Sequence, residues 1–127
     1  MAQDLNQIKS CLDGVGEAFN ANDIDAVMAF FAVDAIFDHA AGPDQHGKRF
    51  EGAETIRGVF QGLFDNVVSV HWETLSEAIS GDRAFCQYRR VAKLKSGEVQ
   101  DFLSVDILTI KDGKITHKDT YYKNRSS

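Results

Sequence analysis

The sequence predicts an α+β domain in which an antiparallel meander carries helices on one face. Two observations predict it. Apolar residues recur with the period of a helix as far as Asn66 and with the two-residue period of a strand beyond it. Short turn sequences then separate the strands, at Ser80–Asp82, Ser96–Gly97 and Asp112–Gly113. The expected order is therefore helix, helix, strand, helix and then four strands.

The first helix is predicted from apolar residues spaced three and four apart, which form one face of a helix. They are Leu5, Ile8, Leu12, Val15 and Phe19. This helix should end near Asn20, and Asn22 can cap a second, shorter helix because its side chain can accept a backbone hydrogen bond there. The expected apolar face of the second helix is Ile24, Val27, Met28 and Phe31.

A short strand, Ala35–His39, and a polar loop, Ala41–Arg49, should come next. The loop is predicted because it holds the only proline of the chain and two of its ten glycines. A third helix should run from Gly52 to Phe64. The four strands that follow should span Val67–Ile79, Arg83–Lys95, Glu98–Lys111 and Lys114–Lys123.

Size and composition exclude several classes of protein. The chain has 127 residues and a mass of 14.1 kDa, which fits a single domain spanning residues 1–127. Its net charge of −5 disfavours nucleic acid and anionic membranes as partners. No apolar stretch approaches the ~20 residues of a membrane span. The cysteines, Cys11 and Cys86, have no metal-binding or redox spacing, so a reducing compartment, the cytoplasm, is expected.

The strand Asp101–Ile110 is apolar in both of its side-chain phases, so both faces of the sheet should be covered. Helices would cover one face and a second copy of the chain the other, which predicts a homodimer through the outer sheet face. Asp106 lies within this strand. Desolvation would keep its carboxyl group neutral and able to donate a hydrogen bond, whereas pairing with Arg89 or Arg90 would keep it charged. Both interpretations remain open.

His39 ends the first predicted strand beside the polar loop, a position that suits proton transfer near neutral pH. A metal ion is not expected, because the spacing of the nearby acids and histidines matches no ligand motif. The candidates considered are Asp38, His39, Asp44 and His46. His117, Asp119 and Tyr121 alternate with other residues near the C-terminus, where a catalytic dyad and a solvated strand both remain possible. No nucleotide- or cofactor-binding motif is found, so no cofactor is expected.

The run Asn22–His39, an acid-capped helix followed by an Asp-Ala pair and an apolar strand, resembles the SnoaL-like and ketosteroid isomerase-like proteins. These belong to the nuclear transport factor 2-like superfamily. Phe50–Phe60 is similar to the family's glycine-started third helix, and Asp112–Thr116 to its penultimate turn. The resemblance covers nearly the whole chain. It implies a cone-shaped, curved antiparallel sheet wrapped around a long N-terminal helix with two shorter helices, usually as a dimer, and by itself no particular activity.

The resemblance also places site residues. Ketosteroid isomerases have a general-base Asp at the end of the first strand, where this chain has His39, and an oxyanion-hole Asp that Asp106 matches in spacing. The family's oxyanion-hole Tyr on the first helix aligns with Val15, so that hydrogen-bond donor is missing here. A pocket Trp near the chain end corresponds to Tyr122.

The expected function is cofactor-independent isomerase, cyclase or lyase chemistry on a small hydrophobic carbonyl compound, polyketide- or steroid-like. His39 would remove a proton next to the carbonyl, Asp106 would donate to the enolate oxygen, and Tyr122 or Tyr88 would add a donor. The pocket walls would comprise Val15, Phe37, Phe60, Tyr88, Phe102 and Leu108. The alternative is a non-catalytic binding or dimerisation module, which a closed apolar interior with Asp106 tied to an arginine would favour.

Overall fold

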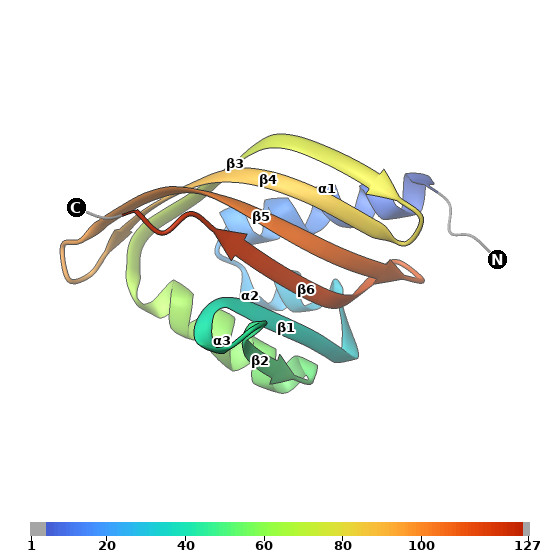
Figure 1. The fold of residues 1–127 in the computed structure, drawn as a ribbon, viewed down its shortest axis with the longest axis horizontal. Coiled ribbons are helices and arrows are strands. Elements are labelled where there is room, and N and C mark those ends of the chain that lie inside the picture. Colours follow the sequence, from blue (N-terminus) through green and yellow to red (C-terminus); the bar gives the residue numbers. More distant parts are fainter. Residues whose placement is uncertain (1–4, 126–127) are drawn as a thin grey trace.

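A computed structural model describes residues 5–125 as a curved six-stranded sheet with three helices on one face (Figure 1). In chain order the elements are α1 (Leu5–Asn20), α2 (Ile24–Met28), β1 (Phe31–Asp44), β2 (Gly47–Glu51), α3 (Ala53–Asp65), β3 (Val67–Ser80), β4 (Arg83–Leu94), β5 (Val99–Lys111) and β6 (Lys114–Tyr122). The strand order across the sheet is β2-β1-β6-β5-β4-β3. The predicted α+β class and the wrapping of the sheet around the long first helix are confirmed.

The four C-terminal strands form the predicted meander, in which each strand pairs antiparallel with the next. The last hairpin closes at Asp112 and Gly113, whose φ angles of 51° and 74° are those that a two-residue hairpin turn requires. The strand boundaries agree with the predicted ones within one or two residues.

One pairing is not antiparallel and joins the two halves of the chain. β1 lies parallel to β6, with Phe37 opposite Lys118 and Asp38 opposite Asp119. Because successive side chains of a strand point to opposite faces, Phe37 and Lys118 share the concave face and Asp38 and Asp119 the outer face. This contact positions both the cavity and the polar network described below.

The prediction of a polar loop over Ala41–Arg49 is wrong. β1 continues through Pro43 to Asp44, and the chain turns back into β2 at the sheet edge. Proline and glycine are compatible with a strand there because the register shifts between His39 and Asp44, as in a β-bulge. Gly47 has a φ of +83°, and a Cβ on it would lie 1.8 Å from the carbonyl oxygen of His39, so only glycine fits this close crossing.

The start of the second helix also differs from the prediction. Asp23, and not Asn22, is the N-cap, and its side chain accepts a hydrogen bond from the Ala26 N–H at 3.1 Å. Asn22 has a φ of 54° and forms the turn after α1. Phe31, expected on the helix, begins β1 instead. Met28 is therefore the last residue of a single-turn helix.

The core lies between the concave face of the sheet and one face of each long helix. The sides of α1 and α3 that face the sheet carry Ile8, Cys11, Leu12, Val15, Ala18, Ile56 and Phe60, all buried. A cluster of aromatic rings extends this core, with Phe60 centred 5.6 Å from Phe31 and 5.1 Å from Phe37. No helix among residues 5–125 is long and apolar enough to cross a membrane.

Candidate active site

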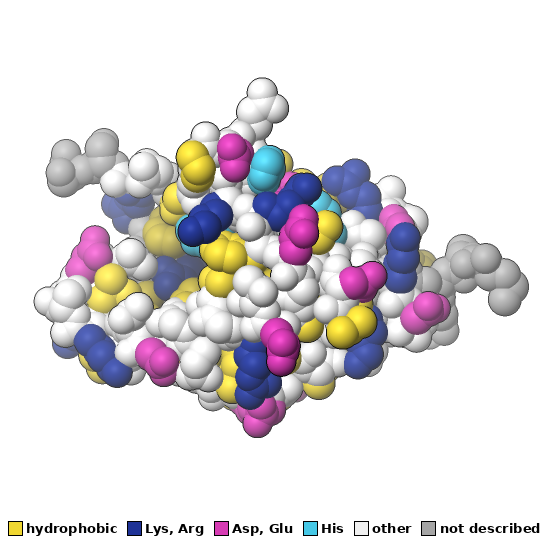
Figure 2. Space-filling model, turned by 90° about the horizontal axis from the view of Figure 1, so that it is seen from below, with side chains coloured by type: hydrophobic (Ala, Val, Ile, Leu, Met, Phe, Trp, Pro, Cys, Tyr) yellow, Lys and Arg dark blue, Asp and Glu magenta, His cyan; other side chains and the backbone are white. Residues whose placement is uncertain are grey.

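A cavity of about 1070 Å³ lies between the helices and the concave face of the sheet. It is built by strand alternation, since every second side chain of β5 and β6 points into it. Those residues are Phe102, Ser104, Asp106, Leu108, Lys118, Thr120 and Tyr122. The cavity reaches exposed residues at the end of β6, and Figure 2 shows the surface recessed near the C-terminal end. A site of this size suits a multi-ring small molecule.

All nine residues predicted for the site line this one cavity. They are His39, Asp106, Tyr122, Val15, Phe37, Phe60, Tyr88, Phe102 and Leu108. The structure thus brings together side chains from α1, α3, β1, β4, β5 and β6. Their assignment to catalysis or substrate binding stays a prediction, because this placement alone does not test any role.

The His39 ring contacts the backbone of Ala41, two residues further along the chain. Its Nδ1 lies 3.1 Å from the Ala41 N–H nitrogen and 3.2 Å from the Ala41 carbonyl oxygen. In the tautomer protonated at Nε2, Nδ1 accepts from the Ala41 N–H. In the tautomer protonated at Nδ1, this nitrogen donates to the Ala41 carbonyl oxygen, and Nε2 is a proton acceptor without a partner among residues 5–125. The ring packs edge-on against Tyr122, with centroids 6.2 Å apart. With its proton on Nδ1, His39 can accept a proton from a ligand in the cavity through Nε2.

Asp106 is not the isolated, neutral acid that one interpretation of the sequence predicts. Its Oδ2 accepts a hydrogen bond from Lys118 Nζ at 2.7 Å, and its Oδ1 accepts one from the Thr120 hydroxyl at 2.7 Å. The pairing with Arg89 or Arg90 is also wrong, because Arg89 binds Asp101 and Arg90 binds Gln100. The charged partner comes from β6, so the cavity contains an ion pair with a hydroxyl group beside it.

Tyr88 supplies a hydroxyl group that stays protonated. Burial, followed by the nearby charge of Asp106, raises the pKa of Tyr88 far above its ordinary value. Its neighbour Cys86 is fully buried, and desolvation raises the pKa of that thiol to about 11. Burial likewise raises the pKa of the Cys11 thiol to about 11. Both thiols are therefore protonated at neutral pH and are poor nucleophiles.

The sequence-based prediction missed Lys118, Thr120, Arg90 and Trp72, which also line the cavity. Lys118 is 8% exposed, and its Nζ lies over the rings of Phe19 and Phe37 at 5.7 and 5.5 Å. The sequence contained a signal for two of these residues, Thr120 and Lys118. Once Tyr122 is placed inside, the two-residue period of a strand puts Thr120 and Lys118 on the same face.

The sequence from residue 14 to residue 118 matches the family model for the SnoaL-like domain. The chain belongs to the SnoaL-like domain family. This confirms the resemblance found in the helix–strand run and in the third helix. Among curated proteins, none matches this SnoaL-like chain in sequence.

Solved structures share the fold of this SnoaL-like chain. A protein of Xanthomonas campestris pv. campestris, provisionally named a polyketide cyclase, is 22% identical over 93% of this chain and 91% of its own, with a TM-score of 0.82. TerC, co-crystallised with polyporic acid, is 16% identical over 92% of each chain, with a TM-score of 0.78. A ketosteroid isomerase-like protein of Catenulispora acidiphila DSM 44928, in complex with trimethylamine, is 20% identical over 89% and 85%, with a TM-score of 0.77. Identities this low establish the fold and no activity.

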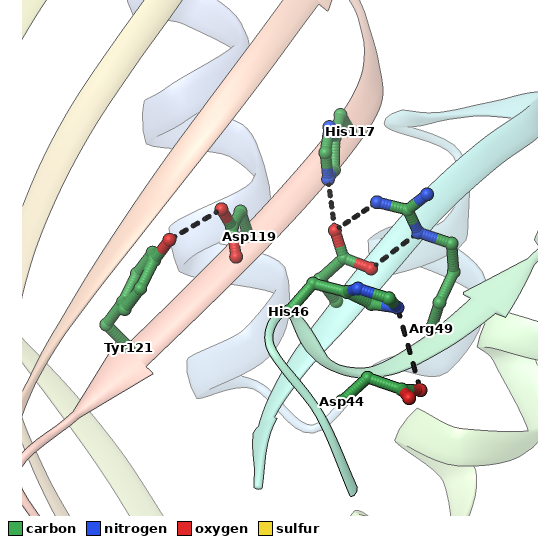
Figure 3. Close-up of polar contacts among 7 residues, drawn as sticks. Asp44, His46, Arg49, His117, Asp119 and Tyr121 are labelled. Carbon is green, nitrogen blue, oxygen red and sulfur yellow. Dashed lines mark hydrogen bonds and ion pairs between the residues drawn. The ribbon is translucent and has the colours of Figure 1, made fainter. Parts of the chain in front are cut away.

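A second polar network lies on the outer face of the SnoaL-like sheet (Figure 3). Asp38 is 2% exposed and receives hydrogen bonds from Arg49 Nε at 2.8 Å and Arg49 Nη2 at 3.0 Å. His117 Nε2 lies 2.7 Å from the second carboxylate oxygen. β6 lies between β1 and β5, so the alternative of an edge strand is wrong. His117 of β6 pairs with Asp38, and Asp119 accepts a hydrogen bond from the Tyr121 hydroxyl group, so a dyad at His117 stays a prediction.

The acids and histidines considered for a metal do not converge. His39 faces the cavity, Asp38 is bound by Arg49, and Asp44 lies 3.9 Å from His46 on the exposed turn. Among residues 5–125, no group of three or more His, Cys, Asp or Glu side chains is placed to hold a metal ion. Figure 2 shows acidic and basic side chains interspersed on the lower face, without a basic stripe.

The Asp38 network predicts a pH-dependent stability. The Arg49 hydrogen bonds, reinforced by His117, hold the pKa of Asp38 below its ordinary 3.8. A lowered pKa stabilises the fold above the unfolded-state value, and this contribution is lost as pH falls through the folded-state value. Asp38→Asn should therefore lower the free energy of unfolding by about 2 kcal/mol at pH 7, because it removes a charge-assisted pair.

Urea unfolding of the two proteins at several pH values checks this. The difference between wild type and Asp38→Asn should shrink as the pH is lowered below 4 on the way to pH 2. Asp44→Asn is the matched control, since Asp44 is 60% exposed and its contact with His46 should contribute little. A difference that stays constant from pH 7 to pH 2 would contradict the argument.

Proposed function

We propose that this SnoaL-like chain binds a small aromatic or polyketide-like carbonyl compound in its cavity and catalyses cofactor-independent acid–base chemistry on it. The reaction class is isomerisation, cyclisation or elimination through an enolate. One observation carries the proposal: an aromatic-walled cavity of about 1070 Å³ into which His39, Tyr88, Tyr122 and the Asp106–Lys118 pair all project.

In this proposal His39 removes the proton next to the ligand carbonyl. The proton goes to Nε2, while Nδ1–H donates to the Ala41 carbonyl oxygen and holds the ring in place. The negative charge that develops on the ligand oxygen needs donors. The Lys118 ammonium group takes the part first assigned to Asp106, because Asp106 serves as its counter-ion. The hydroxyl group of Tyr88 or Tyr122 adds a neutral donor.

Proton exchange with solvent provides the test, because it needs no knowledge of the final product. Ligands are first found by thermal shift, using planar enones, steroids and polyketide-like aromatic ketones, since a ligand that binds the folded state raises its apparent stability. Each ligand is then incubated in D₂O, and deuterium uptake at the carbon next to the carbonyl is followed by mass spectrometry. Binding of several compounds without enzyme-dependent uptake in any of them would contradict the catalytic proposal.

A second candidate function is binding without catalysis, and one observation favours it. Asp106 is already engaged by Lys118 and Thr120. The resemblance also aligns Val15, a residue without a hydrogen-bonding side chain, with the family's first-helix tyrosine. Such a cavity has the shape and the polar groups to bind a ligand but lacks a free acid for catalysis. The deuterium experiment separates the two functions, because a binding module raises the thermal stability with its ligand but leaves the exchange rate unchanged.

We further propose a homodimer through the outer face of the sheet. β4, β5 and β6 carry apolar side chains there, none of them fully buried: Phe85, Val91, Leu103, Val105, Ile107 and Tyr121. Leu103 and Tyr121 are 37% and 57% exposed in the single chain. Exposed apolar side chains on a sheet face are typical of a protein interface.

Leu103→Glu should weaken the dimer at least tenfold, because it buries an unpaired carboxylate in the interface. Its side chain is already exposed in the single chain, so the fold should survive. Sedimentation equilibrium at micromolar concentration measures the dissociation constant. Val68→Glu, on the distant edge strand β3 and 64% exposed, is the control. A wild-type protein that sediments only as a monomer would contradict the proposed homodimer.

A further inference from the structure

Arg90 places a cation inside the cavity without an acidic partner. It lies on β4 in the phase that faces the helices and lines the cavity. Its guanidinium carbon lies 5.8 Å from the ring centre of Trp72 and 5.3 Å from that of Phe102. Its Nη1 donates to the amide oxygen of Gln100 at 2.8 Å. This single neutral acceptor is the only hydrogen-bond partner that the side chain has among residues 5–125.

Two of the other cations near the cavity differ in this respect. Lys118 is paired with Asp106 at 2.7 Å, and Arg89, the preceding residue on the opposite face, is paired with Asp101 at 2.7 Å. No carboxylate forms an ion pair with Arg90 within the described part of the chain. Burial lowers the pKa of Arg90, although a guanidinium group stays charged at any physiological pH. The charge is thus partly desolvated and uncompensated, which is costly unless an anion binds there.

The rings between Arg90 and His39 form a continuous aromatic wall. Phe102 contacts the Arg90 guanidinium group and lies 4.9 Å, centre to centre, from Tyr122. Tyr122 in turn packs against His39 at 6.2 Å. A flat, conjugated molecule lying along this wall would place one end at the cation and the other at the proposed base.

We propose that Arg90 is an anchor for a carboxylate, so that the ligand of this cavity is a planar aromatic acid whose reacting carbonyl lies at the His39 end. The fork of guanidinium N–H groups matches a carboxylate with two parallel hydrogen bonds, which neutral ligands cannot form. A dianion such as a phosphate monoester fits less well, because carboxylates also line the cavity, among them Glu98 and Asp106. The inference rests on the proposed function, in that it requires the cavity to bind a small molecule.

A matched pair of fluorescent probes tests the anchor. Anthracene-2-carboxylate carries the anion, and anthracene-2-carboxamide has the same shape without the charge. Wild type should bind the acid at least tenfold more tightly than the amide. Arg90→Gln should weaken binding of the acid about 30-fold or more and change binding of the amide less than threefold, as expected for truncating one side of a desolvated charge pair. Arg90→Lys keeps the charge but loses the fork, so its loss should be intermediate.

Arg83→Gln is the matched control, because Arg83 lies on the exposed start of β4 and does not line the cavity. It removes the same charge and should leave both dissociation constants unchanged, while circular dichroism confirms that each variant is folded. Equal affinity of wild type for acid and amide, an equal loss for both probes in Arg90→Gln, or no binding of either probe would overturn the inference.

Failure of the anchor and failure of the proposed function have different signatures. If an aromatic keto acid shows enzyme-dependent deuterium uptake and Arg90→Gln leaves its affinity and that of anthracene-2-carboxylate unchanged, the catalytic proposal stands and the anchor is wrong. If the acid binds through Arg90 but no ligand exchanges its proton, the anchor stands and the chain is a binding module.

Discussion

His39→Gln should reduce enzyme-dependent deuterium uptake roughly 10²- to 10⁴-fold, the usual contribution of a positioned general base. The structure supports so large an effect because the His39 ring is the imidazole that lines the cavity and is fixed by Ala41 through Nδ1. Glutamine keeps a polar side chain of similar length but cannot accept and release a proton at neutral pH. Ligand affinity should change little, so the loss should appear in the rate at saturating ligand.

His46→Gln is the control for this variant. His46 lies on the turn between β1 and β2, outside the cavity, with its ring 3.9 Å from Asp44. Its replacement should leave both uptake and affinity within twofold of wild type. An exchange rate in His39→Gln within threefold of wild type would mean that another group removes the proton, and the proposed mechanism would have to be abandoned.

Asp106→Ala should lower the free energy of unfolding by about 2–4 kcal/mol, because it leaves the Lys118 ammonium group buried without a counter-ion. The two side chains are only 14% and 11% exposed, so solvent cannot replace the lost partner fully. The value lies below the usual cost for a sealed interior because both groups face a cavity that reaches the surface.

The double variant Asp106→Leu with Lys118→Met separates charge from packing. Replacing both charges by apolar side chains removes the unpaired charge, so most of the lost stability should return. Urea unfolding monitored by tryptophan fluorescence measures all three proteins. Asp13→Ala is the control, since its contact with Lys9 is on the surface, where Asp13 is 56% exposed, and should cost less than about 0.5 kcal/mol. A double variant as unstable as Asp106→Ala would show that the pair acts through shape and not charge.

Local patterns in the sequence were sufficient for most elements of the fold. The apolar spacing from Leu5 to Phe19 identified α1 because burial of one face has the period of the helix itself. The Asp112–Gly113 turn identified the last hairpin because its backbone conformation depends on those two residues. The second strand, Gly47–Glu51, was missed, since a bulged edge strand tolerates the proline and glycines that ordinarily mark a loop.

The candidate site was predictable in part. His39 and Asp106 were singled out from the strand patterns and Tyr122 through the family resemblance, and the structure places all three at one cavity. Their partners were not found. Lys118 reaches Asp106 only because β6 pairs with β5, and it meets the ring of Phe37 only because β6 also lies beside β1. The pairing of β1 with β6, which are far apart in the chain, leaves no mark on the local periodicity of either strand.

The sequence by itself determined the secondary structure of the helices and the meander, the acidic and apolar character of the chain, and the side chains available for chemistry. Only the tertiary structure decided which charges meet: Asp106 with Lys118, Asp38 with Arg49 and His117, and Arg90 with no acid. The physical reason is one of range. Helix and turn formation depend on neighbours within about four residues, whereas ion pairing and desolvation depend on distances in space. Strand pairing sets these distances: β2 brings Arg49 to Asp38, β6 brings His117 to the same carboxylate, and the β5–β6 hairpin brings Lys118 to Asp106.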